Sequence, residues 1–101
     1  MRIFVRPHGE WSARSLELLQ RRLEFAFGRF NGRVRSLSVQ LRDLNGPRGG
    51  VDKQCLIAVR LDRPKREILI EDVDSEEAGA ISRAAERASR AVARAIHASG
   101  D

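Results

Sequence analysis

The chain has 101 residues, a length that suits one domain, residues 1–101, around a single modest core. Its 19 Lys+Arg residues outnumber its 14 Asp+Glu residues, and the formal net charge of +5 and the pI near 10.9 favour a polyanionic partner, with nucleic acid the leading candidate. The single cysteine excludes an intrachain disulfide and a thiolate metal site, and no apolar run is long enough for a signal peptide or a membrane span, so we expect a cytoplasmic protein without a metal or cofactor.

The first two elements are a strand and a helix. Residues 2–6 alternate apolar and other side chains, which predicts a short strand that ends at Pro7. Ser12 or Ser15 is the expected N-cap of a helix that runs to about Gly28, with leucine and phenylalanine at helical spacing on one face. Its arginines lie mostly elsewhere on the helix surface: Arg14, Arg21, Arg22 and Arg29.

Three further strands follow. Asn31 and Gly32 close the helix, and residues 33–43 alternate so that one face of the predicted strand is apolar and the other is wet. A turn-rich segment, residues 45–50, leads into a second alternating stretch, so the two strands form an antiparallel hairpin. A turn at residues 62–65 precedes a fourth strand, which is expected to end near Asp72.

The last element is a helix that begins at Asp74 or Ser75, with Glu76 and Glu77 in its first turn, where the helix dipole favours carboxylates. The order is therefore β-α-β-β-β-α, an α+β fold. Strands with one apolar face each predict a four-stranded sheet with both helices packed on one face, and a right-handed crossover from the first strand to the second.

A stripe of four arginines marks this last helix: Arg83, Arg87, Arg90 and Arg94 recur at steps of four, three and four residues and therefore share one face. The apolar residues fall on the opposite face: Ile81, Ala85, Ala88, Val92 and Ile96. Packing should therefore not need the arginines, and only Glu86 interrupts the row. An ordinary solvated face is the alternative, but we interpret the stripe as a polyanion-binding surface. This hypothesis requires guanidinium groups that are not occupied by carboxylates of the same molecule.

Other chemically distinctive residues give weaker patterns. Arg48 on the Gly-rich loop either adds a phosphate contact or belongs to a hairpin loop with no specific role. Neither His8 nor His97 has the partners of a metal site or a catalytic base, and Cys55 lies in an apolar run that predicts a buried, inert thiol. Trp11 before the first helix is expected to pack as a staple. Nothing in the sequence indicates an active site, so we do not expect an enzyme.

Several short sequence motifs resemble those of the ribosome hibernation promoting factor and ribosome-associated inhibitor A family. The length of the chain resembles that of the family's short form. Arg22-Leu23-Glu24, followed by Phe27, matches the Lys-Leu-Glu and aromatic ending of the family's first helix, and Ala80-Ile81 matches the Ala-Ile at the start of its second. The family's second helix carries Lys, Arg and Lys at the positions of three stripe residues: Arg87, Arg90 and Arg94. The resemblance covers essentially the whole chain and implies a fold like that of double-stranded-RNA-binding domains.

The resemblance implies a translation regulator that lodges in the messenger and transfer RNA channel of the small ribosomal subunit and stabilises idle ribosomes. The residues expected to contact phosphates of the ribosomal RNA are the four stripe arginines together with Arg21, Arg22, Arg29 and Arg48. We expect a monomer off the ribosome, with no small-molecule substrate.

Two other classes of function stay open. The first is a protein-interaction module or homodimer that uses the open sheet face, because Phe4, Leu56 and Leu69 are expected to lie there. The second is a general double-stranded-RNA binder. The strands offer too few aromatic residues for a base-stacking platform, so any RNA must be bound by the helices.

Overall fold

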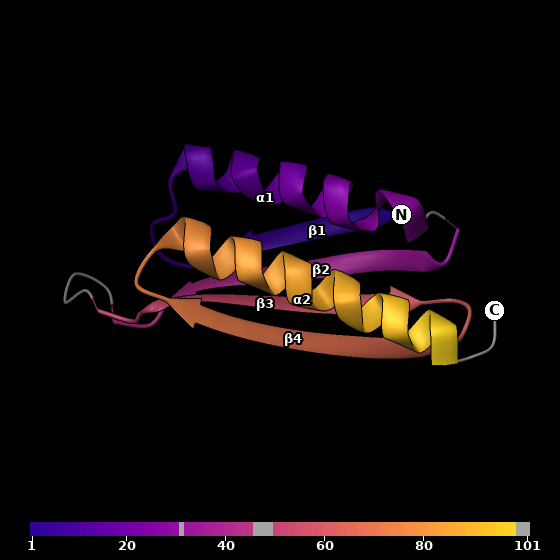
Figure 1. Cartoon of the computed structure of the whole chain (residues 1–101). Coiled ribbons are helices and arrows are strands. Elements are labelled where there is room, and N and C mark those ends of the chain that lie inside the picture. The colour runs from indigo at the N-terminus through magenta and orange to yellow at the C-terminus, as the bar shows by residue number, and fades with distance from the viewer. Residues whose placement is uncertain (31, 46–49, 99–101) are drawn as a thin grey trace.

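Six main elements follow one another in the order that the sequence predicts (Figure 1). The computed structural model describes residues 1–30, 32–45 and 50–98, so the predicted roles of Asn31 and Arg48 lie outside the described residues. The elements are β1 (Arg2–Pro7), α1 (Ala13–Phe27) with the 3-10 turn η1 (Gly28–Phe30), β2 (Val34–Asp43), β3 (Lys53–Leu61), β4 (Arg66–Asp74) and α2 (Glu77–Ala98).

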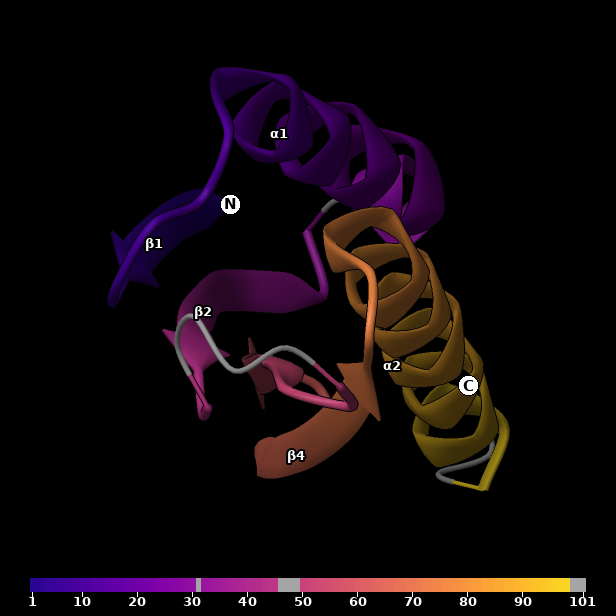
Figure 2. The same cartoon turned by 90° about the vertical axis from the view of Figure 1, so that its left-hand side faces the viewer.

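The four strands form one sheet in the order β1-β2-β3-β4. β1 is parallel to β2, and the other two pairs are antiparallel, so the predicted hairpin of β2 and β3 is confirmed. A parallel pair needs a long crossover, and α1 supplies it. Both helices lie on one face of the sheet and run in the same direction (Figures 1 and 2). The other face is open, as the alternation of apolar and polar residues predicts.

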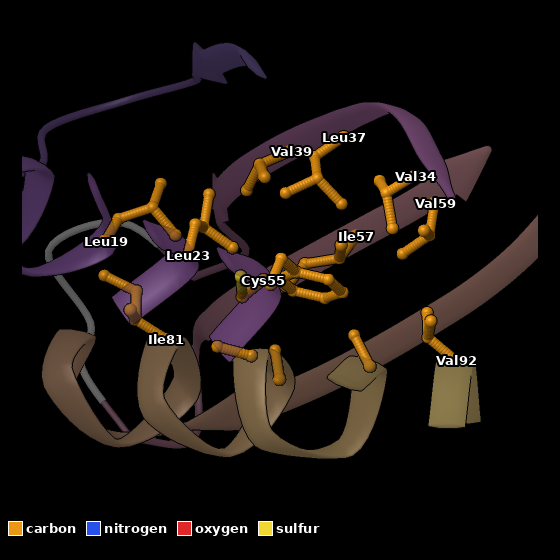
Figure 3. Close-up of a cluster of buried hydrophobic side chains, with 14 of the residues drawn as sticks. Leu19, Leu23, Val34, Leu37, Val39, Cys55, Ile57, Val59, Ile81 and Val92 are labelled. Carbon is orange, nitrogen blue, oxygen red and sulfur yellow. The ribbon is translucent and has the colours of Figure 1, made fainter. Parts of the chain in front are cut away.

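The core lies between the sheet and the two helices (Figure 3). α1 contributes Leu19, Leu23 and Phe27, each of them fully buried. α2 contributes mostly small side chains, which let its backbone approach the sheet closely: Ala80, Ile81, Ala84, Ala85, Ala88, Val92 and Ala95. Cys55 of β3 lies inside this cluster, and burial, aided by the charge of Asp72, raises the pKa of its thiol to about 12. The predicted buried thiol is confirmed.

One carboxylate joins the N-termini of the two helices. Ser12 is the N-cap of α1, and its hydroxyl accepts a hydrogen bond from the amide of Ser15. Glu77 Oε1, in the first turn of α2, accepts hydrogen bonds from the amide and hydroxyl of Ser12, at 3.2 and 3.0 Å, and from the hydroxyl of Ser15, at 2.5 Å. The two serines that the sequence offers as alternative caps therefore act together: Ser12 is the cap, and both serines link α1 to α2 through Glu77.

α2 begins at Glu77, two to three residues later than the sequence predicts. Asp74 is the last residue of β4, and its Oδ1 accepts a hydrogen bond of 3.0 Å from the amide of Glu76. Asp74 thus makes the side-chain hydrogen bond that is typical of an N-cap, but its backbone still belongs to β4.

Gly79 in the first turn of α2 lies directly against Asp74. A Cβ atom at this position would overlap Oδ2 of Asp74 and lie 2.8 Å from its Cγ. Alanine inside a helix is normally favoured over glycine by about 1 kcal/mol, but here the clash displaces a carboxylate that accepts three hydrogen bonds. We expect Gly79→Ala to destabilise the protein by about 1–3 kcal/mol in urea unfolding.

Gly28 provides the matched control, because its φ is −56° and nothing lies within 4 Å of a Cβ atom built there. Gly28→Ala is expected to be neutral or to stabilise by up to about 1 kcal/mol. If both variants raised the free energy of unfolding by the same amount, the Asp74 carboxylate would move aside without an energetic cost.

Candidate nucleic-acid interface

Every arginine that the sequence assigns to RNA binding, and that the structure describes, is exposed to solvent: Arg21, Arg22, Arg29, Arg83, Arg87, Arg90 and Arg94. The four stripe residues lie on the face of α2 opposite its buried alanines, so their predicted orientation is confirmed. The two helices present these side chains on the side of the molecule away from the open sheet face.

Arg83 is occupied by the end of β4. Its Nε donates to Asp72 Oδ1 at 3.1 Å, and its Nη2 donates to Asp74 Oδ2 at 2.7 Å and to the carbonyl oxygen of Val73 at 3.1 Å. The side chain of Asp72 is only 10% exposed. Hydrogen bonds and ion pairs of this partly buried kind are harder to exchange than pairs in open water.

Arg87 repeats the arrangement one turn further along α2. Its Nη1 donates to Asp72 Oδ2 at 3.0 Å and to the carbonyl oxygen of Glu71 at 2.6 Å. β4 is an edge strand, so carbonyl groups on its outer side lack a partner strand. The two guanidinium groups therefore fasten α2 to β4 and cover part of the free edge of the sheet.

These contacts correct the expectation that packing does not need the stripe. Arg83 and Arg87 join the helix to the sheet, and their charges are balanced by Asp72 and Asp74. The sequence holds a sign of this, because both carboxylates continue the inward side of β4 after Ile68 and Ile70. Acidic residues on the helix-facing side of a strand need cations from the covering helix.

Asp74 and Arg83 shift each other's protonation equilibria. The amide of Glu76, and then the guanidinium of Arg83, hydrogen-bond to Asp74 and lower the pKa of its carboxyl group below the ordinary 3.8. The same contact, followed by the one to Asp72, raises the pKa of Arg83. Both shifts favour the ion pair between helix and strand.

Acid is therefore expected to weaken the fold. Burial raises the pKa of Glu77, but the hydrogen bonds from Ser15 and Ser12 outweigh it and leave the pKa below the ordinary 4.5. Because the folded-state pKa values of Glu77 and Asp74 lie below the unfolded values, their stabilisation is complete above the unfolded values and is lost as pH falls through the folded ones. Urea midpoints measured below about pH 5 should drop more steeply for the wild type than for an Asp74→Asn/Glu77→Gln double variant. Parallel pH profiles would contradict this.

The remaining arginines are held loosely or not at all. Arg90 pairs with Glu86 at 2.5 Å and Arg21 with Glu17 at 4.0 Å, and both are exposed pairs one helical turn apart, worth about 0.3–0.5 kcal/mol. Such pairs exchange readily for phosphate. Within the described ranges, three arginines of the predicted set form neither an ion pair nor a side-chain hydrogen bond: Arg22, Arg29 and Arg94.

The requirement for unoccupied guanidinium groups is thus not met by three of the four stripe residues. Arg83 and Arg87 are bonded to β4, Arg90 has an exchangeable partner, and Arg94 meets the requirement. The four stripe residues are therefore not equally available to a polyanion, and a grip by all four stays a prediction. The loosely held cations are found instead on both helices.

A groove between α1 and α2 is lined by two of these arginines. It encloses about 520 Å³. Its lining residues are Arg22, Phe25, Ala26 and Arg29 of the α1 side and Ser82, Ala85, Glu86 and Ser89 of α2. The guanidinium of Arg29 lies 4.5 Å from the centre of the Phe30 ring, which fixes its direction. Sequence reasoning named the two arginines but missed the groove, because the parallel alignment of the helices creates it.

The open sheet face has a different character. Phe4 and Leu69 are 49% and 71% exposed, as expected, but they occupy opposite ends of one cross-strand row, with Ser38 and Ala58 between them. Leu56 is half-buried and lines a shallow hollow with Leu69. Phe4 is therefore separated from Leu56 and Leu69, and a protein partner there stays a prediction.

In the part of the chain that the structure describes, no group of three or more His, Cys, Asp or Glu residues is arranged to hold a metal ion. The described helices also include none whose length and apolar character would let it cross a membrane. Trp11 is half-buried, packs against the core and donates its indole hydrogen bond to the carbonyl oxygen of His8, which confirms the predicted packing role.

Comparisons with known proteins add evidence on the fold. No family model and no curated protein sequence matches the chain. Among solved structures, the N-terminal domain of Protein Y from Thermus thermophilus aligns with a TM-score of 0.68 at 22% identity, over 92% of this chain and 93% of that one. A ribosomal subunit interface protein from Coxiella burnetii aligns with a TM-score of 0.73 at 12% identity, over 93% and 96%. The chain therefore has the fold of these two proteins, which is the fold that the sequence resemblance implied.

Proposed function

We propose that this protein binds the small ribosomal subunit, with its helices against ribosomal RNA, and that it stabilises idle ribosomes by occupying the messenger and transfer RNA channel. The observation that carries the proposal is the fold, which matches a ribosomal subunit interface protein over 93% of the chain. The exposed arginines on the helical side support it. A protein acting on ribosomes would work in the cytoplasm.

The arginines would act by holding phosphates. The proposed contacts are Arg22, Arg29, Arg90 and Arg94, with Arg21 and Arg48 as outer members of the set. Phosphate contacts fix position and orientation without reading bases, so specificity would come from the fit of the protein to a shaped RNA cleft. Arg83 and Arg87 still expose 51% of their side chains and add to the local potential, but their first role is to hold α2 on β4.

The proposed mechanism involves no covalent step. A body with principal extents of 47 × 20 × 16 Å excludes other ligands from the volume that it fills. The affinity for RNA then determines how long the channel stays blocked. One of the two solved structures that share this fold is named as a ribosomal subunit interface protein.

Sedimentation of the purified protein with small ribosomal subunits over a series of salt concentrations tests the proposal. If about four phosphates are neutralised, log affinity should fall against log salt with a slope of roughly −3 to −3.5. An excess of an unrelated RNA duplex should not displace the protein. Failure to sediment with subunits, or affinity independent of salt, would overturn the proposal, and equal competition by the duplex would favour a general double-stranded-RNA binder.

A second candidate function is a protein-interaction module on the open sheet face. The observation that favours it is the exposed Leu69 beside the hollow that Leu56 lines. Light scattering across protein concentration tests the homodimeric version. If the mass stays that of a monomer at all concentrations and the protein binds ribosomes, the homodimer is rejected and the first proposal is supported.

A further inference from the structure

Phe25 is the most exposed large apolar residue among those described, with 87% of its surface accessible. The residues of α1 that build the core lie on the opposite face of the helix, so the phenyl ring contributes little to folding. A single exposed apolar side chain is common on protein surfaces. The surroundings of this one are what point to a ligand.

Two cations flank the ring on the same helical face. Arg22 precedes Phe25 by three residues and Arg29 follows it by four, and both spacings place side chains next to each other. All three line the groove between α1 and α2. Arg29 is already directed by its contact with Phe30, at 4.5 Å. An exposed aromatic ring with an arginine about one helical turn away on either side thus lines a hollow of about 520 Å³.

The far wall of the groove is polar. Ser82 and Glu86 of α2 line it, and Arg90 lies beside it through its pair with Glu86. Three arginines against one glutamate give the groove a positive balance. This balance disfavours a basic peptide and suits an anionic chain whose units also carry flat faces, which is the chemistry of a nucleic-acid strand.

We infer that this groove holds one unpaired nucleotide of the bound RNA, with its base stacked on Phe25 and its adjoining phosphates held by Arg22 and Arg29. The inference rests on the proposed function and adds a base contact to a surface otherwise expected to touch only phosphates. The nucleotide must be unpaired, because the face of a base inside a helix is covered by its neighbours. The site therefore selects a loop, bulge or strand end and disfavours a continuous duplex.

Two substitutions separate stacking from simple apolar contact. Phe25→Leu keeps the apolar volume but removes the aromatic face, and Phe25→Trp enlarges that face. With small ribosomal subunits as the probe, the leucine variant should bind between about fivefold and about a hundredfold more weakly. The tryptophan variant should bind at least as well as the wild type. Because the side chain is 87% exposed, both variants should fold normally, which urea unfolding checks.

A photoreactive phenylalanine analogue at position 25 identifies what lies on the ring. After irradiation of the complex with small subunits, we expect the crosslink on a single-stranded position of ribosomal RNA. A crosslink only to a ribosomal protein, or only to duplex RNA, would overturn the inference. So would equal affinities of the wild type and the leucine variant.

The experiment also separates this inference from the proposed function. If the wild type binds subunits and the leucine variant binds equally well, the base contact is wrong and the ribosome-binding role stands. If the wild type itself does not bind, the proposed function is wrong and the base contact is lost with it.

Discussion

Replacing Phe27 by alanine is expected to lower the free energy of unfolding by about 3–5 kcal/mol, the largest effect of any single substitution considered. The side chain is fully buried in the cluster between helices and sheet, and its ring packs against that of Phe30 with centroids 6.2 Å apart. Truncation removes this apolar burial and leaves a cavity. Because domains of this size are stable by only about 5–15 kcal/mol, the variant should unfold at a much lower urea concentration.

Phe25 is the matched control, since it is the same residue type on the same helix, two positions away. Phe25→Ala should change the free energy of unfolding by no more than about 0.5 kcal/mol, as is usual at exposed positions. The pair tests the placement of α1 directly. Similar losses in both variants would mean that the helix is rotated about its axis relative to the structure described above.

Replacing Arg22, Arg29 and Arg94 together by glutamine is expected to lower the affinity for small subunits on the order of a hundredfold at about 0.1 M salt. Three phosphate contacts would be lost, so the slope of log affinity against log salt should become shallower by about 2 to 3. Stability in urea should change little, because none of the three has a carboxylate partner among the described residues. Sedimentation with subunits measures the affinity.

The control for the triple variant is Arg83→Gln/Arg87→Gln. This pair should have the opposite profile, with a clear loss of stability and a smaller loss of affinity, because these side chains hold α2 on β4. The result that would contradict the assignment is a double variant that binds as weakly as the triple variant while keeping full stability. The phosphate contacts would then lie on the first half of α2.

Much of the fold follows from periodicity alone. The alternation in β2 and β3 determines which side chains face the helices, and Leu37, Val39 and Cys55 are buried accordingly. The start of α2 was predicted too early because Asp74 satisfies the rules for an N-cap while it still belongs to a strand. Local rules cannot decide between those two states, because the pairing of β4 with β3 determines the outcome.

The candidate site was predicted less well, again because the sequence pattern of one element does not show its contacts with other elements. Spacing along α2 correctly gives the face that carries Arg83 and Arg87, but it does not reveal that Asp72 lies within reach of both. The groove that contains Phe25 was missed because it exists only where two helices distant in sequence lie side by side. Properties of one element are readable from sequence, whereas properties shared by two elements require their relative placement.

Charged side chains are distributed unevenly along the two parallel helices. Glu77 joins the two helix N-termini at one end, where Asp74 also lies, whereas Arg29 and Arg94 lie toward the C-terminal ends of α1 and α2. Along the long axis of 47 Å these side-chain charges form a dipole, which is opposed by the helix macrodipoles with their positive ends at the N-termini. In the field of a polyanion such a dipole experiences a torque. We therefore expect the protein to rotate before it touches its target and to arrive with the arginine-bearing end leading.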